Sequence, residues 1–352
     1  MKRKISGVLI LVLGFCGTLL AMDLYLQAAE IQTPMETRID PETGPAYVNG
    51  KKVTRFNEGF YIGGINSQGY YGPARVREAD HGEKRILMLG DSFVMGITLF
   101  ERYHFGTLLE SELNEDYESK IEILNFGRAD FNFWNMYQYY LDFASKWDHD
   151  LVLFLVGRTD IIPARQIETD LYPFCYLDGD SLRINYEFRN SNKFKAYTAM
   201  APLVNNSSLF RMSYNTRKMI ARGELTALML DKFAPLFDKE SKAPRGEAGG
   251  AKGKRDLPPV TLAILDKLSR NPKAVLVIKK PISEELRAQI DQFSLPVVDI
   301  SGVLTGLEDE GIDPYYWPVT GKRGHWNHLA HERIASALRE ELRRELARRD
   351  IH

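Results

Sequence analysis

RILMLGDSFVMG, from Arg85 to Gly96, is an apolar run that stops at Gly-Asp-Ser and then becomes amphipathic. Such a run, rich in Ile, Leu and Met without polar alternation, is typical of a parallel strand buried on both faces. The serine that ends it, Ser92, fits two interpretations. It is either the cap of the following helix or an exposed nucleophile at the end of a buried strand. The rest of the chain decides between them.

Four further apolar runs follow the first, and helical patterns separate them. The five candidate strands are 85–90, 121–126, 151–156, 274–279 and 296–300. The candidate helices are 103–115, 133–146, 257–270 and 282–292, with a last helix marked by Leu329, Ile334, Leu338, Leu342 and Leu346. This alternation predicts an α/β fold with a doubly wound, mostly parallel, flavodoxin-like sheet. The functional site is then expected at the carboxyl ends of the strands.

The organisation of the chain follows from changes in composition. Residues 1–28 are expected to form a signal anchor or transmembrane helix, and 29–80 a tether followed by a small β arm. Residues 81–352 then form the α/β domain, which a helical insertion at 163–258 interrupts. Within this insertion, the charged and Gly-rich stretch 238–256 is predicted to be a disordered loop.

The N-terminus indicates the compartment. The basic residues Lys2, Arg3 and Lys4 precede an uncharged apolar run, Ile5–Met22. This pattern is typical of an export signal whose basic end stays in the cytoplasm. We expect an uncleaved anchor that leaves the rest of the chain periplasmic or extracellular. Cleavage within LQAAE, after its first or second alanine, is the alternative.

Composition excludes several function classes. Hydrophobic residues make up 44% and charged residues 26% of the chain, as in ordinary globular proteins. A formal net charge of -1 argues against a nucleic-acid partner. Of the two cysteines, Cys16 lies in the apolar N-terminal run, so Cys175 stands alone in the folded part. No disulfide and no cysteine-based zinc site is therefore expected there.

Small or polar residues follow the first three candidate strands. Ser92 follows the first strand, Gly127 the second, and GRTD (157–160) the third, while His325 lies in GHWNHLAHE before the last helix. A serine at a strand end, backbone-exposing residues beside it and a late histidine are the parts of a serine hydrolase. The hydroxyl needs a base to become nucleophilic, and the developing oxyanion needs preorganised donors.

In this order the motifs resemble those of the SGNH (GDSL-like) hydrolase superfamily, over about residues 66–340. GDS matches the first block, Gly127 the second, GRTD the third and RGHWNHLAH the fifth, and INSQGYYGP resembles the lead-in of exported, membrane-anchored members. The resemblance implies that Ser92 is the nucleophile and His325 the general base. The oxyanion hole would use the backbone N–H groups of Ser92 and Gly127, with Thr159 at the place of the third-block asparagine.

Two positions depart from the family pattern. Thr159 replaces an asparagine whose side chain donates to the oxyanion, and Arg323 stands where the acid before the histidine is expected. The third member of a triad is therefore open. Asp313 precedes His325 by a few residues, while Asp160 and Asp299 lie at strand ends, and the sequence does not choose among them.

The predicted function is an extracytoplasmic serine esterase or O-acyl (acetyl) transferase. By resemblance, its substrate is an ester on a surface or secreted polysaccharide, and it needs no cofactor. A metal site at His325, His328 and His331 is not expected, because their spacing spreads them too widely around a helix. Two alternatives stay open. One is a lipid-directed esterase, which an exposed apolar helix in 205–236 would favour, and the other is a non-catalytic surface protein with a degenerate site.

Overall fold

The computed structural model describes residues 2–29, 36–163, 171–221, 223 and 256–350. By its internal contacts the chain divides into two units, Met1–Glu36 with Asn190–Ala248, and Thr37–Arg189 with Gly249–His352. The predicted loop 238–256 lies outside the described residues except for its last one. The second unit contains the α/β fold and the candidate site residues Ser92, Gly127, Thr159 and His325.

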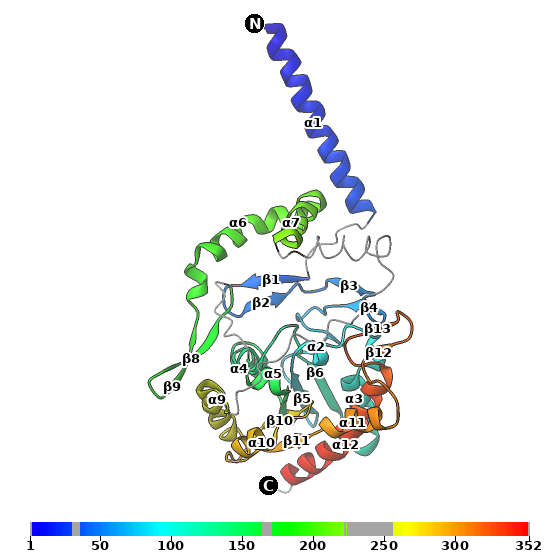
Figure 1. Ribbon diagram of the computed structural model, residues 1–352, viewed down its shortest axis with the longest axis vertical. Helices are drawn as coiled ribbons and strands as arrows, with labels where there is room; N and C mark the ends of the chain where they lie inside the picture. The colour runs from blue at the N-terminus through cyan, green and yellow to red at the C-terminus, as the bar shows by residue number, and fades with distance from the viewer. Residues whose placement is uncertain (1, 30–35, 164–170, 222, 224–255, 351–352) are drawn as a thin grey trace, which may run out of the picture. The chain divides into compact units, whose positions relative to one another are not determined.

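A five-stranded parallel sheet forms the centre of the second unit (Figure 1). Its strands are β5 (Lys84–Leu89), β6 (Ile121–Asn125), β7 (Leu151–Val156), β10 (Ala274–Ile278) and β11 (Val297–Asp299). They lie in the order β11-β10-β7-β5-β6, and every neighbouring pair is parallel. The order reverses beside β5, as in flavodoxin-like sheets, and ligands bind at such a switch point. The predicted doubly wound fold is confirmed.

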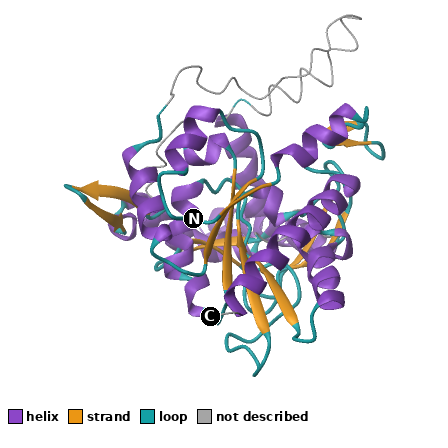
Figure 2. Ribbon diagram, turned by 90° about the horizontal axis from the view of Figure 1, so that it is seen from below, coloured by secondary structure: helices purple, strands orange, loops and turns teal. Residues whose placement is uncertain are grey.

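Helices cover both faces of this sheet (Figure 2). One face packs against α3 (Phe105–Asp116), α11 (Ser301–Asp309) and α12 (His328–Asp350). The other face packs against α4 (Phe133–Asp142), α9 (Pro259–Ser269) and α10 (Glu284–Ile290). Alternation along β5 supplies both cores, with Ile86 in one and Leu87 in the other. Of these helices, α11 is absent from the sequence prediction.

The N-terminal arm consists of two antiparallel hairpins. They are β1 (Thr37–Asp40) with β2 (Gly44–Tyr47), and β3 (Lys52–Arg55) with β4 (Tyr61–Gly64). Their apolar side chains form a small core with Met95, the last residue of the short helix α2 (Ser92–Met95). Packing on α2 brings the arm to the carboxyl end of β5, where the site is expected.

Short elements complete the second unit. They are a hairpin of β8 (Phe174–Asp178) and β9 (Ser181–Asn185), a two-residue pair of β12 (Tyr316–Trp317) and β13 (Lys322–Arg323), the helix α5 (Arg158–Ile161), and the 3₁₀ turns η1 (Glu101–Tyr103), η2 (Ala144–Lys146) and η3 (Glu187–Asn190). The β8–β9 hairpin falls in the segment predicted to be a helical insertion, and Cys175 from it joins the core on the α4 side.

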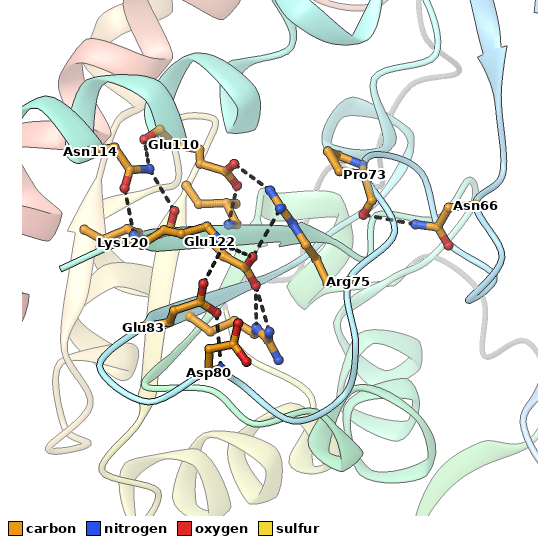
Figure 3. Close-up of polar contacts among 12 residues, drawn as sticks. Asn66, Pro73, Arg75, Asp80, Glu83, Glu110, Asn114, Lys120 and Glu122 are labelled. Carbon is orange, nitrogen blue, oxygen red and sulfur yellow. Dashed lines mark hydrogen bonds and ion pairs between the residues drawn. The ribbon is translucent and has the colours of Figure 1, made fainter.

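A cluster of paired charges around the buried Glu122 fixes the segment ahead of β5 to the sheet (Figure 3). Arg85, only 1% exposed, donates to Glu122 over 2.7 Å. Arg75 bridges Glu122 (3.1 Å) and Glu110 (2.8 Å), and Lys120 lies 2.9 Å from Glu122. Buried charges are tolerated when they are paired in this way. The cluster lies at the amino ends of β5 and β6, away from Ser92, and its role is structural.

The first unit contains α1 (Lys2–Ala28), α6 (Asn192–Asn206) and α7 (Ser208–Ala221). In α1, Asp23 accepts hydrogen bonds from the Leu209 N–H (2.7 Å) and the Ser207 hydroxyl (3.0 Å). The segment Ile10–Ala28 is long and apolar enough to be a membrane anchor or a signal sequence. Of the helix considered at 205–236, α7 is described and the part beyond 223 lies outside the described residues.

Candidate active site

Ser92 is the first residue of α2, directly after the tight turn that ends β5. Asp91 caps this helix, because its side chain accepts a hydrogen bond from the Phe93 N–H (3.0 Å). Gly90 makes the turn possible, since a Cβ there would lie 2.1 Å from a methyl group of Val94. The capping interpretation therefore applies to Asp91, and the Ser92 hydroxyl is left for another partner.

That partner is His325. Its Nε2 lies 2.8 Å from Ser92 Oγ, and its Nδ1 lies 3.1 and 3.0 Å from the two carboxylate oxygens of Glu58. The backbone N–H of His325 also donates to Glu58, over 2.5 Å. A carboxylate facing Nδ1 favours the tautomer with its proton there, which leaves Nε2 free to accept the serine proton. Glu58, His325 and Ser92 thus form a continuous hydrogen-bonded chain.

Glu58 comes from the loop between β3 and β4, in the N-terminal arm. The hydroxyl of Thr320 donates to the Glu58 carbonyl oxygen over 2.5 Å. Two glycines allow the close approach of the loops: a Cβ on Gly59 would lie 2.2 Å from the ring of Trp317, and one on Gly324 would lie 2.2 Å from the Glu58 carboxyl carbon. Burial raises the pKa of Glu58, but hydrogen bonds from His325 and its charge lower that pKa more, so the net direction is downward.

The structure corrects the expected acid partners of His325. Asp313 forms an ion pair with Arg323 (2.9 Å), the residue that stands at the family's acid position. Asp160 pairs with Lys279, and Asp299 accepts hydrogen bonds at the start of α11. Sequence reasoning missed Glu58 because it lies upstream of the GDS motif, in the turn between two short strands of the predicted β arm, where no motif marks it.

Asp91 and Asp160 share one buried cation. Lys279, which follows β10 and is 2% exposed, lies 2.8 Å from Asp91 and 2.9 Å from Asp160. Asp160 also accepts a hydrogen bond from the Gly157 N–H (2.7 Å). Burial raises the pKa of Asp160, and the charge of Lys279 opposes that rise. The three side chains join the turns that follow β5, β7 and β10, so they set the position of Ser92 without contacting it.

The three groups expected to form the oxyanion hole, at Ser92, Gly127 and Thr159, differ from one another in exposure and in hydrogen-bond partners. The Gly127 N–H donates to Asn125 Oδ1 (2.9 Å). Gly127 is needed for packing, because a Cβ there would lie 2.3 Å from the Met95 nitrogen in α2. Thr159 is exposed on α5. The Ser92 N–H lies at the first position of α2, where a helix has no internal acceptor for it.

A pocket of about 270 Å³ opens onto the Glu58–His325–Ser92 chain. Beside these three residues, its wall is formed by the apolar side chains Met95, Ile97 and Ala129 and by Arg55, Asn57, Gly59, Thr98 and Asp130. Neither Gly127 nor Thr159 is among the described residues that line it. An ester that enters the pocket would meet the Ser92 hydroxyl, a small apolar surface and a polar rim.

The remaining histidines of the last motif diverge from His325. His331 is buried in α12, and its Nδ1 accepts a hydrogen bond from the Phe105 N–H (3.0 Å), while burial lowers its pKa. His328 is exposed and lies edge-on to Trp317. In the part of the chain that the structure describes, no group of three or more His, Cys, Asp or Glu side chains is arranged to hold a metal ion.

Comparison with known proteins found matches among solved structures. No family model and no curated protein matches the chain. A member of the lipolytic G-D-S-L family from Veillonella parvula is 11% identical, with a TM-score of 0.33 over 73% of this chain and 97% of that one. The acetyl xylan esterase AlAXEase is 13% identical (TM-score 0.35, 73% and 98%). The lipase Lip_vut3 from a goat rumen metagenome is 15% identical (TM-score 0.31, 73% and 96%).

Similarities of this size carry no information on activity or substrate. The assignment of the fold depends on the chain itself. Its sheet has the strand order of a flavodoxin-like fold, and its GDS turn follows the first strand of that sheet. The histidine ahead of its last helix faces the serine of that turn. The chain therefore has a doubly wound, flavodoxin-like α/β fold in which the serine of the GDS turn meets the histidine ahead of the last helix.

Proposed function

We propose that the chain is a serine esterase or O-acyl transferase in which Ser92 is the nucleophile and His325 the general base. One observation carries the proposal: hydrogen bonds of 2.8 to 3.1 Å join Glu58 to His325 and His325 to Ser92. A serine that only capped a helix would not need to face a histidine whose other ring nitrogen is held by a carboxylate. The arrangement provides what a weak hydroxyl nucleophile requires.

In the first half of the reaction, Ser92 Oγ attacks the ester carbonyl carbon while its proton passes to His325 Nε2. Glu58 stabilises the imidazolium that forms and holds the ring in place. The tetrahedral intermediate then breaks its bond to the alcohol oxygen, which takes the proton from Nε2 and leaves. The acyl group stays on Ser92. Attack by water on this ester completes hydrolysis, whereas attack by another hydroxyl completes transfer.

The carbonyl oxygen becomes negatively charged in the intermediate and needs donors. The Ser92 N–H at the start of α2 is the first that we assign to it. The resemblance implies the Gly127 N–H as the second. Gly127 does not line the pocket as it stands, so this N–H would have to exchange its present acceptor, Asn125 Oδ1, and turn towards the substrate oxygen. Thr159 is given no part, because it is exposed outside the pocket. Loss of one oxyanion donor typically lowers kcat by about 10²–10³. Because Asn125 Oδ1 competes with the substrate oxygen for the Gly127 N–H, the site is expected to turn over slowly.

The pocket favours a small acyl group on a polar alcohol. Met95, Ile97 and Ala129 offer a small apolar surface, while the charged residues Arg55 and Asp130 line the same space. A lipid chain would place an apolar surface against these charged groups, which is unfavourable. We therefore propose an acylated saccharide as the substrate. The lipid-directed alternative would need a large apolar wall at this pocket.

Two exposed aromatic rings support a saccharide. Phe56 (54% exposed) and Phe60 (41%) lie directly before and after the lining residues 57–59, with their rings edge-to-face at 5.5 Å. Exposed aromatic rings beside a polar pocket suit a ligand with both apolar faces and hydroxyl edges.

The non-catalytic alternative rests on the departures at Thr159 and Arg323. The second departure is compensated, because Glu58 occupies the position of the acid and Arg323 is paired with Asp313. A protein whose site had decayed would have no reason to keep this substitute contact. We retain the catalytic proposal.

The proposed location is extracytoplasmic, periplasmic or extracellular, with α1 as an uncleaved membrane anchor. The basic residues that begin α1 support retention of that end in the cytoplasm, and its apolar segment supports a single membrane span. The membrane is then a partner through α1 alone. A polysaccharide at the cell surface would be accessible to a site held there.

The test is hydrolysis of 4-nitrophenyl acetate by the detergent-solubilised full chain. Ser92→Ala is expected to lower kcat/KM by about 10³-fold or more, because the nucleophile of a triad is lost. Ser145→Ala, at an exposed serine outside the pocket, is the matched control and should equal the wild type. Equal turnover by the wild type and Ser92→Ala would contradict the assignment.

A further inference from the structure

Asp130 has an unusual backbone. Its φ is 63°, and it is the one non-glycine residue with positive φ among those the structure describes. It is the third residue of a tight turn in which the Phe131 N–H donates to the Arg128 carbonyl (3.3 Å). A positive φ at this place in a turn favours glycine, and aspartate is one of the few residues with a side chain that adopts it. A side chain at such a position suggests a use for it.

The turn is fixed beside the nucleophile. The Arg128 N–H donates to the carbonyl of Gly90 in the GDS turn (3.0 Å). The Arg128 side chain is buried, with its guanidinium 4.2 Å from the ring centre of Tyr47 and 4.9 Å from that of Tyr139. These contacts hold the turn from both sides. Asp130 therefore has a defined place relative to the catalytic serine.

That place is the wall of the pocket. Asp130 is exposed, and it lines the same space as Ser92, His325 and Glu58. A substrate whose acyl carbon reaches Ser92 Oγ fills this space with its alcohol part. A carboxylate can only accept hydrogen bonds, and the hydroxyl groups of a saccharide are donors. Glycine would fit the backbone better and would offer no acceptor.

Building on the proposed function, we propose that Asp130 determines substrate specificity by accepting hydrogen bonds from hydroxyl groups on the alcohol part of the ester. Its effect is confined to substrates that carry such hydroxyls. The acyl-transfer chemistry at Ser92 does not pass through it. Asp130 then occupies a left-handed backbone position in the pocket wall, and its side chain there serves recognition. Its replacement by glycine should weaken substrate recognition without impairing folding.

The experiment compares Asp130→Gly with the wild-type full chain on two acetyl esters, monoacetylated glucose and 4-nitrophenyl acetate. The inference predicts a fall of about tenfold or more in kcat/KM for monoacetylated glucose, the size expected when a hydrogen bond to a charged group is lost. For 4-nitrophenyl acetate, whose alcohol part has no free hydroxyl, kcat/KM should stay within twofold. The temperature of thermal unfolding should not fall, because glycine relieves the backbone.

Asp130→Asn is the matched variant. It keeps an acceptor oxygen and tolerates a left-handed backbone, so it should retain most of the activity on monoacetylated glucose. A loss on Asn as large as on Gly would mean that an acceptor oxygen at this position does not account for the recognition, and it would overturn the inference. So would equal loss on both esters, no loss on either, or no wild-type turnover of monoacetylated glucose. Failure of Ser92→Ala to reduce hydrolysis of 4-nitrophenyl acetate would overturn the proposed function instead.

Discussion

Ser92 begins α2 one residue after the cap that Asp91 provides, and this offset leaves its hydroxyl to His325. The sequence alone showed a serine after a buried strand, for which capping is common. Whether a side chain caps a helix depends on a hydrogen bond between neighbours, which the sequence does not display. The partner across the site, 233 residues away, resolves the choice.

Glu58 is the residue that the sequence least revealed. Asp313 is close to His325 along the chain, yet its carboxylate is paired with Arg323. Glu58 is 267 residues from His325 and reaches it because the β3–β4 loop packs against the loop that carries the histidine. Nothing in the pattern around FNEGF indicates such a long-range contact. Only the packed arm makes it visible.

Replacing Glu58 by glutamine is expected to lower kcat for 4-nitrophenyl acetate by about 10²-fold or more, because a neutral amide cannot stabilise the imidazolium as a carboxylate does. KM should change much less, since the pocket keeps its shape. Steady-state kinetics at neutral pH check this. Activity equal to that of the wild type would show that Glu58 has no part in the reaction.

The same variant has a predicted pH dependence of stability. His325 lowers the pKa of Glu58 below its usual range despite burial, so the folded state binds its proton more weakly than the unfolded state. This stabilisation is complete above the ordinary pKa of glutamate and is lost as the pH falls through the lower folded value. The difference in free energy of unfolding between wild type and Glu58→Gln should therefore shrink on acidification in urea titrations. A difference that grew towards acid pH would contradict the direction of the shift.

At the scale of elements, the strands were predictable because burial on both faces requires unbroken apolar runs. All five strands of the sheet coincide with such runs, within one or two residues at their ends. The elements that sequence missed, such as α11 and the β8–β9 hairpin, are short and half-exposed. Their patterns, for example SLRIN in β9, are too brief to distinguish from loops.

The junction between the β3–β4 loop and the loop before α12 depends on Gly324. A Cβ there would lie 2.2 Å from the Glu58 carboxyl carbon. Gly324→Ala should push that carboxylate away from His325 and lower kcat towards the level of Glu58→Gln. In the double variant the effects should not add, because both remove one contact. Gly302→Ala, where a Cβ would meet nothing within 4 Å, is the control, and fully additive effects would contradict the mechanism.

Lys279 joins three element ends through Asp91 and Asp160. Lys279→Met should lower the free energy of unfolding by about 3–5 kcal/mol at neutral pH, because it leaves two carboxylates buried without a cation. The difference in free energy of unfolding between Lys279→Met and the wild type should become smaller as the pH falls and the carboxylates take up protons. Burial already raises the pKa of Asp160, which favours this uptake.

Lys280→Met is the control for that variant. Lys280 lies 4.2 Å from the ring centre of Phe93, an interaction worth about 0.5–1 kcal/mol at partly exposed sites. Denaturant titration of the three proteins at two pH values provides the comparison. Equal stability of Lys279→Met and the wild type would show that the buried trio does not hold the turns together.

At the scale of the molecule, the site includes a segment that lies outside the alternating pattern of strands and helices. The sheet supplies Ser92 and the loop ahead of α12 supplies His325, while the N-terminal arm supplies Glu58 and part of the pocket wall. The sequence predicted a tether followed by a small β arm, and none of the arm's residues was among the candidate site residues. A segment that precedes the fold in the chain therefore completes the proposed triad.

The central claim is that Ser92 is activated by His325, and covalent labelling with a fluorophosphonate tests it most directly. The account predicts one label per wild-type chain, located on Ser92 by peptide mass spectrometry, with no label in Ser92→Ala and labelling slowed by about 10²-fold or more in His325→Ala. A label on another residue, or labelling of Ser92 at the same rate without His325, would contradict the account.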